Sequence, residues 1–300
     1  MADFKKRKTN NPTYKEIGSS ESDAVREIYT LEDIIKSTSS WEQDDCNALR
    51  ITFRNANTIS DMVQQHELDG EYLKLVLPNW NMDTFKNPIY SGIDRKVSTI
   101  IDKAGIILAR TEKDSKQEAD VDSLVMSLMI FLRFDDYPLQ LQNHPHVLDI
   151  KRQDLITSIP DYAVVSRAGN ENILVVVEDK DSFAATQLDN WSEPQIAGEI
   201  FASAIYNSRG ITGIKYPYNI IAMRVIGTRF TFYKTVIKEA YMRETRTKLP
   251  RTSSMEILRY PQQLDPSNGL VAWNFCDEND RLNILKTLRS IEGMAIGENV

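Results

Sequence analysis

Two neighbouring segments near the middle of the chain have the hydrophobic pattern of β-strands. Residues 162–166 are rich in β-forming side chains, and residues 173–177 are an unbroken apolar run. Between them, residues 167–172 contain a glycine and two asparagines, which are typical of a turn. The pattern therefore predicts two antiparallel strands, and the six-residue turn sets Ser166 opposite Ile173.

The same register brings two acidic residues together, because it sets Asp161 opposite Glu178. Directly opposed residues in a sheet have Cβ atoms about 4.5–5.5 Å apart, where two carboxylates repel each other. Side chains alternate along a strand, so Glu178 and Lys180 share one face and Asp179 turns to the other. Two acids and a lysine at the end of an apolar strand are unfavourable without a cation, which makes this stretch the clearest functional signal in the sequence.

Helical spacing predicts one helix before these strands and another after them. In residues 118–134 the apolar side chains form a single stripe, and Glu118 lies on the edge of that stripe. Its carboxylate either leans toward the buried seam or favours the positive end of the helix dipole, and both interpretations stay open. Ser192 followed by Pro194 is typical of a helix start, and the helix that begins there carries Gln195.

Later segments continue the alternation of strands and helices. Residues 218–225 and 228–236 are predicted strands joined by a turn at Gly227. Residues 238–251 are a basic helical stretch that ends near a proline. Residues 282–294 are a predicted amphipathic helix that packs back onto the body.

The N-terminal third gives mixed signals. Residues 1–20 are polar and are predicted to be a flexible tail, in which Lys5-Lys6-Arg7-Lys8 is either a nuclear import signal or an ordinary basic run. Residues 21–112 are expected to form an N-terminal region of uncertain fold, with mixed helix, strand and loop signals, that selects a substrate or a partner.

The segment between the first predicted helix and the strand pair, residues 135–153, reads as a loop with one short element. It contains His144-Pro145-His146, whose two imidazoles resemble half of a metal site. No third ligand stands nearby at a supporting spacing, so the pattern favours a loop over a metal site here.

The composition is that of a folded protein. Three hundred residues with 41% hydrophobic content allow one large domain or two modest ones, and 26% charged residues is an ordinary proportion. No apolar run approaches the ~20 residues of a membrane span, and the N-terminus lacks the apolar segment of a signal peptide. We therefore expect an intracellular protein, nuclear or cytoplasmic, with no membrane partner. Cys46 and Cys276 lie far apart and indicate neither a disulfide framework nor a zinc site.

Charge is distributed unevenly along the chain. The net charge is −7, yet residues 200–260 hold eleven Lys and Arg against three Glu, a local balance of +8 that leaves −15 for the remainder. Such a segment suits a phosphate-bearing partner, and a solvated basic face is the alternative that charge alone leaves open. The candidate nucleic-acid-binding cations are Arg224, Arg229, Lys234, Lys238, Arg243, Arg246, Lys248 and Arg251.

Pro160-Asp161, followed seventeen residues after the aspartate by Glu178-Asp179-Lys180, resembles the signature of the PD-(D/E)xK nuclease superfamily. The predicted order of helices and strands agrees with it. The resemblance implies an α/β protein with a restriction-endonuclease-like αβββαβ core, a mixed central sheet flanked by helices, next to the N-terminal mixed region. It covers residues 113–237, and we expect the nuclease-like domain to extend over residues 113–300 with the C-terminal helix.

The resemblance also implies a metal site of oxygen ligands, which select Mg²⁺ or Mn²⁺. Asp161 and Glu178 would be the primary ligands, and Asp179 would contribute its backbone carbonyl. Glu118 matches the acidic residue that the family often carries on its first helix. It would complete the ligand shell or hold a second metal.

Two further residues match catalytic positions of the family. Lys180 would orient or deprotonate the attacking water, or stabilise the charge that develops on the phosphate. Gln195 resembles the polar residue that several branches place on the following helix. The resemblance therefore implies an enzyme, a metal-dependent phosphodiester hydrolase that acts on nucleic acid, with DNA favoured over RNA.

Three alternatives stay open at this point. The same fold can serve as a catalytically weak nucleic-acid-binding module, or the acidic face can engage a basic protein partner. The acids and the lysine can also be a structural salt bridge. A homodimer is compatible with the resemblance, because many nucleases of this type pair to cut both strands. A phosphate-binding loop of the ATPase type is absent from the sequence.

Overall fold

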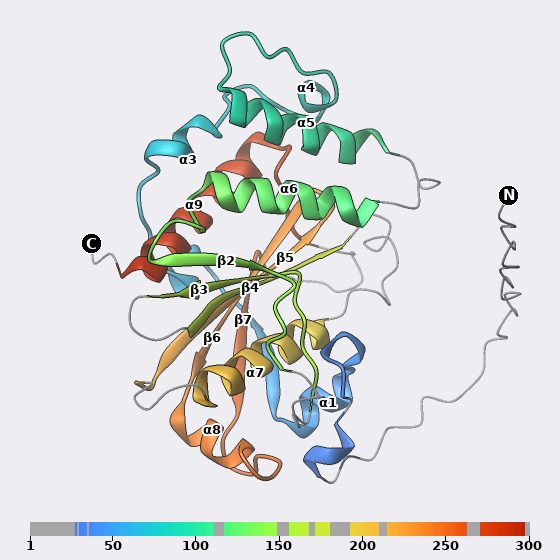
Figure 1. Ribbon diagram of the computed structural model, residues 1–300, viewed down its shortest axis with the longest axis vertical. Helices are drawn as coiled ribbons and strands as arrows, with labels where there is room; N and C mark the ends of the chain where they lie inside the picture. The colour runs from blue at the N-terminus through green and yellow to red at the C-terminus, as the bar shows by residue number, and fades with distance from the viewer. Residues whose placement is uncertain are drawn as a thin grey trace, which may run out of the picture.

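A mixed β-sheet runs through the middle of the protein (Figure 1). The computed structural model describes residues 28, 30–34, 36–110, 117–148, 156–167, 172–180, 193–209, 215–262 and 271–297, with the backbone alone at 117, 172–174, 176 and 178–180. The sheet order is β1-β7-β6-β5-β4-β3-β2, and β8 pairs with β6. The strands are β1 Ile51–Asn55, β2 Leu139–Asn143, β3 Tyr162–Ser166, β4 Asn172–Lys180, β5 Tyr218–Ile226, β6 Arg229–Ile237, β7 Met255–Tyr260 and β8 Trp273–Asn274.

Most neighbouring strands are antiparallel, with two exceptions. β2, β3 and β4 pair antiparallel, as do β5, β6 and β7. β4 and β5 are parallel, and β1 is parallel to β7. Parallel neighbours need a crossover connection, and α7 Glu193–Arg209 lies between β4 and β5 in the chain.

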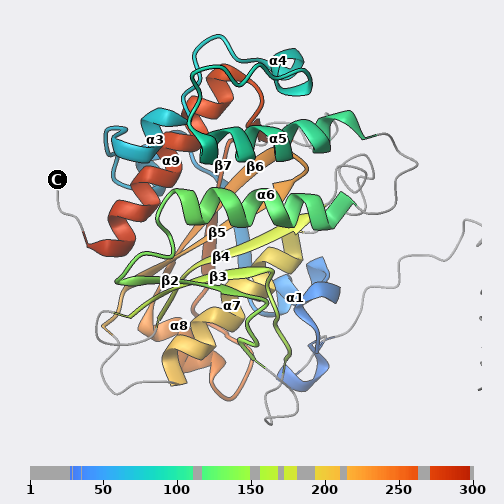
Figure 2. The ribbon, with the colours of Figure 1, turned by 45° about the horizontal axis from the view of Figure 1, so that its top comes forward.

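Helices cover both faces of the sheet. Figures 1 and 2 show α5, α6 and α9 over one face and α7 with α1 over the other. Besides α7, the helices are α1 Gln43–Ala48, α2 Ile59–Met62, α3 Gly70–Lys74, α4 Met82–Lys86, α5 Arg95–Ala109, α6 Gln117–Phe131, α8 Glu239–Thr245 and α9 Glu278–Ile296, with short 3-10 helices η1 Leu31–Asp33 and η2 Thr38–Ser40. Within the described part of the chain, no helix is long and apolar enough to cross a bilayer.

The two helix layers create two hydrophobic cores, and strand alternation divides the sheet residues between them. Val164 of β3 and Met223 of β5 belong to the core with α6 and α9. Ala163 and Ala222, their neighbours along the same strands, belong to the core with α7. Small residues on the α7 side allow this helix to lie close to the sheet.

The N-terminal region shares the sheet and the core with the rest of the chain. β1 pairs in register with β7, from Ile51 with Met255 to Asn55 with Arg259. α5 packs against α6, so that Ile101 and Leu128 lie in one core cluster. Residues 51–109 therefore help to build the body around the sheet.

The structure confirms the coarse prediction of a mixed α/β protein whose mixed sheet is flanked by helices. The predicted helix over residues 118–134 is α6, and β3 and β4 lie where the sequence predicts them. Gly227, with φ of 59°, turns the chain between β5 and β6 as expected. Asp277 accepts hydrogen bonds from the first turn of α9, which explains why this helix begins earlier than predicted.

Other predictions need correction. Ser166 pairs with Asn172 and not with Ile173, because a register shift between Val164 and Val165 leaves Leu174 of β4 without a counterpart. The basic helical stretch predicted over residues 238–251 is reduced to α8. The short element expected in the loop after α6 is β2, and β7 was not predicted at all.

Candidate metal centre at one end of the sheet

The residues of the candidate site lie where several elements begin or end together. β4 and β5 end side by side, with Lys180 in register with Ile226. β3 begins at the same end, since it runs antiparallel to β4. The Tyr162 hydroxyl donates to the backbone oxygen and to Oδ1 of Asp122, over 3.0 and 2.5 Å, so the first turns of α6 also lie over this end.

The strand register places Asp161 next to Glu178. The last paired residues at this end of β3 and β4 are Tyr162 and Val177. One position further out along the same register stand Asp161 and Glu178, as the sequence predicts. The register shift at Leu174 lies on the turn side of these pairs and leaves the site end unchanged.

Asp161 is mostly buried and has a histidine beside it. Its side chain is 18% exposed, and its Oδ1 lies 3.8 Å from Nδ1 of His144. The backbone N–H of His144 donates to the Asp161 carbonyl over 2.8 Å, continuing the pairing of β2 with β3. The sequence predicts a loop around His144, and only the pairing of β2 with β3 shows that this residue lies beside Asp161. His146 is exposed.

Glu178, Asp179 and Lys180 form the end of β4. Their backbone pairs in parallel with that of Arg224, Val225 and Ile226 on β5. Their side chains lie outside the described structure. The register alone therefore shows that the Glu178 position lies between the Asp161 position and Arg224.

Arg224 is buried, at 2% exposed, which corrects its interpretation as a nucleic-acid-binding residue. It alternates with Ala222 on the side of the sheet that α7 covers. A guanidinium in the interior needs charged or polar neighbours, because its desolvation is otherwise very unfavourable. Because its positive charge lies next to the Glu178 position, it reduces the electrostatic cost of placing carboxylates at the neighbouring Asp161 and Glu178 positions.

The first residue of α7 contributes a mostly buried ion pair to this region. Arg259 Nη1 donates to Glu193 Oε1 over 2.6 Å. Burial raises the pKa of Glu193, and the nearby charges of Arg259 and Arg224 oppose that rise. Tyr233 is fully buried beside the pair, and burial raises the pKa of its hydroxyl. The sequence did not single out Glu193 or Arg259, because their pairing joins residues 66 positions apart.

Gln195 is buried in the first turn of α7, and its Nε2 donates to Oε1 of Glu199 over 3.3 Å. Glu199 is 1% exposed and was not predicted as a site residue. The sequence does carry a signal for Glu199, because a glutamate between Ile196 and Ile200 lies on the apolar stripe of a helix, where charged residues are rare.

Glu118 is exposed on α6, one helical turn before Asp122. Residues four apart share a helix face, so Glu118 stands on the face whose Asp122 meets Tyr162. The first turn of α6, which carries Glu118, therefore lies over the end of the sheet where β3 begins.

The other predicted cations separate into two groups. Arg229 is exposed and pairs with Ile226, at the site end of the sheet. Lys234 is half-buried, donates from Nζ to the Asp61 carbonyl over 3.4 Å, and has its pKa lowered by burial. Beyond the far end of β6 lie the exposed residues Lys238, Arg243, Arg246, Lys248 and Arg251. β6 has eight steps of about 3.3 Å, so this second group lies about 26 Å from the site end.

The donor chemistry at Asp161 fits a hard divalent cation. Carboxylate oxygens are the ligands that Mg²⁺ and Mn²⁺ prefer, and the register supplies two neighbouring carboxylate positions. Among the residues whose side chains are described, no group of three or more His, Cys, Asp or Glu could hold a metal ion. A complete ligand set therefore needs the side chains of β4.

No protein-family model matches this chain, and no curated protein matches it in sequence.

Proposed function

We propose that this protein is a Mg²⁺- or Mn²⁺-dependent nuclease with a restriction-endonuclease-like core. The order α6-β2-β3-β4-α7-β5 follows the αβββαβ order of the PD-(D/E)xK superfamily. The observation that carries the proposal is the β3–β4 register, which makes Asp161 and Glu178 neighbours at the end of the sheet. In this proposal the Pro-Asp and Glu-x-Lys motifs form one site.

Asp161 and Glu178 would hold the cation, with the Asp179 carbonyl and Glu118 as further ligands. When bound, the metal would supply positive charge that activates a water and neutralises a phosphate oxygen. Lys180 would orient or deprotonate that water, or stabilise the negative charge that develops on the phosphate. Gln195 and Glu199 form a buried hydrogen-bonded pair on α7 that would support the site from the helix side.

The substrate in this proposal is a nucleic acid, with DNA favoured over RNA. Arg229 is exposed at the site end and would contact a backbone phosphate there. Cleavage of both strands of a duplex needs two such sites, which a homodimer would provide. Sedimentation of the protein with and without DNA measures whether it dimerises.

The test is a cleavage assay on single- and double-stranded DNA and RNA with Mg²⁺ and with Mn²⁺. Asp161→Asn and Lys180→Met should each lose at least about a hundredfold in rate, the scale of a single catalytic group. Glu256→Gln is the matched control, since Glu256 is an exposed strand residue paired with Arg54 on the surface.

Cleavage that survives both site substitutions would refute the nuclease. Binding of nucleic acid without cleavage would favour the catalytically weak binding module. Neither cleavage nor nucleic-acid binding, with no response to Mn²⁺, would favour a protein-interaction module.

A further inference from the structure

The backbone of two paired strands holds His144 beside Asp161. His144 directly follows β2, whose last residue Asn143 pairs with Tyr162. The pairing continues one step further, because the His144 N–H donates to the Asp161 carbonyl over 2.8 Å. The sheet itself therefore fixes where this histidine lies relative to the aspartate.

The backbone conformation of His144 is uncommon. Its φ is 43°, in the left-handed region that residues other than glycine rarely adopt. Conformations of this kind are concentrated at functional sites, where the surrounding structure holds a side chain in a required place. The conformation of His144 is thus a second observation, independent of its distance from Asp161, that points to a role for its side chain.

The imidazole is oriented by its neighbours and is accessible from solvent. Its Nδ1 lies 3.8 Å from Oδ1 of Asp161, and the side chain is 51% exposed. The ring lies at 22° to that of Tyr162, with the two centroids 6.4 Å apart. The Tyr162 hydroxyl is fixed in turn by its hydrogen bond to Asp122. The described contacts therefore aim one ring nitrogen at the Asp161 carboxylate.

The distance between this nitrogen and the carboxylate suits two ligands of one ion. At 3.8 Å the two atoms are too far apart for a direct hydrogen bond. Two donors that each lie about 2.1 Å from the same cation are about 3.0 Å apart at a right angle and about 4.2 Å apart in line. The observed distance lies between these limits, and a neutral imidazole offers a lone pair at one ring nitrogen.

We propose that His144 is a nitrogen ligand of the cation that Asp161 holds, and that it makes this site select Mn²⁺ over Mg²⁺. The inference rests on the proposed metal centre and deepens it. Mg²⁺ takes oxygen ligands, whereas first-row transition-metal ions also accept imidazole nitrogen. One imidazole next to the carboxylates therefore adds affinity for Mn²⁺ and little affinity for Mg²⁺.

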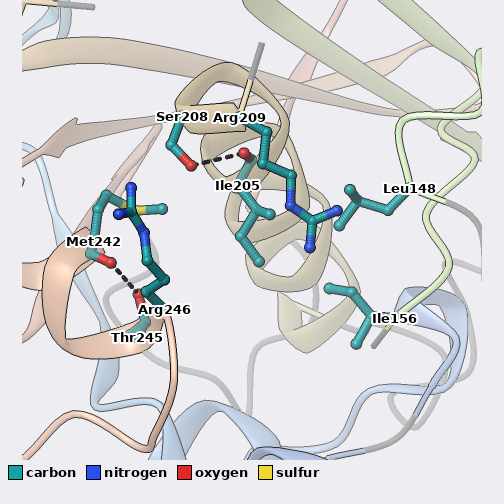
Figure 3. A pocket seen from close by; sticks show the side chains of 8 residues that line it. All are labelled: Leu148, Ile156, Ile205, Ser208, Arg209, Met242, Thr245 and Arg246. Atoms are coloured by element: carbon teal, nitrogen blue, oxygen red, sulfur yellow. Dashed lines mark hydrogen bonds between the residues drawn. The ribbon is translucent and has the colours of Figure 1, made fainter. Parts of the chain in front are cut away.

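A pocket of about 430 Å³ between the C-terminal part of α7 and α8 does not compete for this ion (Figure 3). Its described lining residues include no His, Cys, Asp or Glu. Figure 3 shows Arg209 and Arg246 on opposite sides of Ile205. A divalent cation finds neither carboxylate nor imidazole there, so its saturable binding reports on another part of the chain.

The test is isothermal titration calorimetry of the full chain with Mn²⁺ and with Mg²⁺, in the absence of nucleic acid. It compares the wild type with His144→Asn, because asparagine tolerates the same left-handed backbone and offers an amide oxygen in place of the nitrogen. The substitution should weaken Mn²⁺ binding about tenfold or more and change Mg²⁺ binding by less than about twofold. His146→Asn is the matched control, since His146 is an exposed histidine two positions further on, and it should bind both ions as the wild type does.

Electron spin-echo spectroscopy of the bound Mn²⁺ identifies the ligand directly. The nitrogen modulation of a coordinated imidazole should be present in the wild type and in His146→Asn, and absent in His144→Asn. Thermal unfolding in EDTA verifies that both variants are folded.

Equal Mn²⁺ affinity of the wild type and His144→Asn would overturn this inference and leave the metal centre standing. Tighter Mn²⁺ binding by the variant would also overturn it, because it would show that His144 forms an ion pair that competes with the metal for Asp161. A wild type that binds neither ion would refute the metal centre itself, and this inference with it.

Discussion

Arg259 Nη1 donates to Glu193 Oε1 over 2.6 Å and joins β7 to the first residue of α7. The two side chains are only 12% and 17% exposed. Through Nε and Nη2, Arg259 also donates to Oδ1 of Asn55 over 3.2 and 3.0 Å. One guanidinium therefore connects β1, β7 and α7 next to the candidate metal centre.

Loss of this arginine should be strongly destabilising. Arg259→Met leaves the mostly buried Glu193 carboxylate without its ion-pair partner, which lowers the free energy of unfolding by up to about 3–5 kcal/mol. Arg54→Met is the control, since the Arg54–Glu256 pair is more than half exposed and should change stability by about 0–1 kcal/mol. Urea denaturation of both variants measures the difference, and equal losses would contradict the prediction.

The destabilisation by Arg259→Met should depend on pH. Burial raises the pKa of Glu193 and Arg259 opposes the rise, so the variant has a still higher folded-state pKa. A raised carboxyl pKa contributes stability that is present below the unfolded value, about 4.3, and is lost as the pH rises through the folded value. The deficit relative to the wild type should therefore be largest at neutral pH and shrink on acidification. A deficit that is constant with pH would refute this account.

Divalent metal should stabilise the folded protein if Asp161 and Glu178 are ligands. A ligand at a hundred times its Kd adds about 2.7 kcal/mol to the free energy of unfolding. Thermal unfolding with Mn²⁺ measures this as a rise in Tm. Asp161→Asn should remove the rise, and Glu256→Gln should retain it. The idea fails if the Asp161→Asn protein responds to Mn²⁺ as the wild type does.

Arg229 and Arg243 should differ in their effect on the cleavage of nucleic acid at the candidate metal centre. Arg229 lies at the site end of β6, and Arg243 lies beyond the opposite end, about 26 Å away. Arg229→Ala should slow cleavage. It should also reduce the slope of log K for binding against log salt concentration by about 0.9, the value for one duplex phosphate contact. Arg243→Ala should leave the cleavage rate unchanged. Equal effects of the two substitutions on cleavage would place the substrate elsewhere.

Gly198 of α7 should not tolerate even a methyl group. A Cβ at this position would lie 2.9 Å from Cδ2 of Trp41 and 3.0 Å from Cβ of Thr38. Gly198→Ala gains about 1 kcal/mol of helix propensity, but overpacking against the buried indole costs about 1–3 kcal/mol. We therefore expect a lower Tm in thermal unfolding, whereas a higher Tm would show that the contact relaxes freely.

Glu244 should titrate far below an ordinary glutamate. The Thr252 hydroxyl and the backbone N–H groups of Thr252, Ser253 and Arg251 donate to its carboxylate and lower its pKa to about 2. A lowered pKa contributes stability above the unfolded value, and this is lost as the pH falls through the folded value. NMR titration of the Glu244 side chain should give a midpoint near 2 in the wild type and in Thr252→Ala a higher one. An unchanged midpoint in that variant would contradict this assignment.

The sequence by itself was sufficient to predict the elements whose pattern is local. β-Forming side chains predicted β3, an unbroken apolar run predicted β4, and helical spacing predicted α6, because each of these signals is carried by a few neighbouring residues. The sequence also predicted that Asp161 lies opposite Glu178, but it did so from a Ser166–Ile173 pairing that the structure does not have, and the extra residue Leu174 in β4 offsets that difference. Val175 and Val177 must both face the core, and that requirement holds the register at the site end even though Leu174 shifts it near the turn.

Only the tertiary structure decided which residues far apart in the chain become neighbours. His144 lies beside Asp161 because β2 joins the sheet at its edge, and Arg259 reaches Glu193 because β7 lies between β6 and β1. The same folding buries Arg224 and carries the basic α8 away from the candidate site. Local patterns contain no information on these placements, since burial and charge pairing depend on the order of strands in the whole sheet.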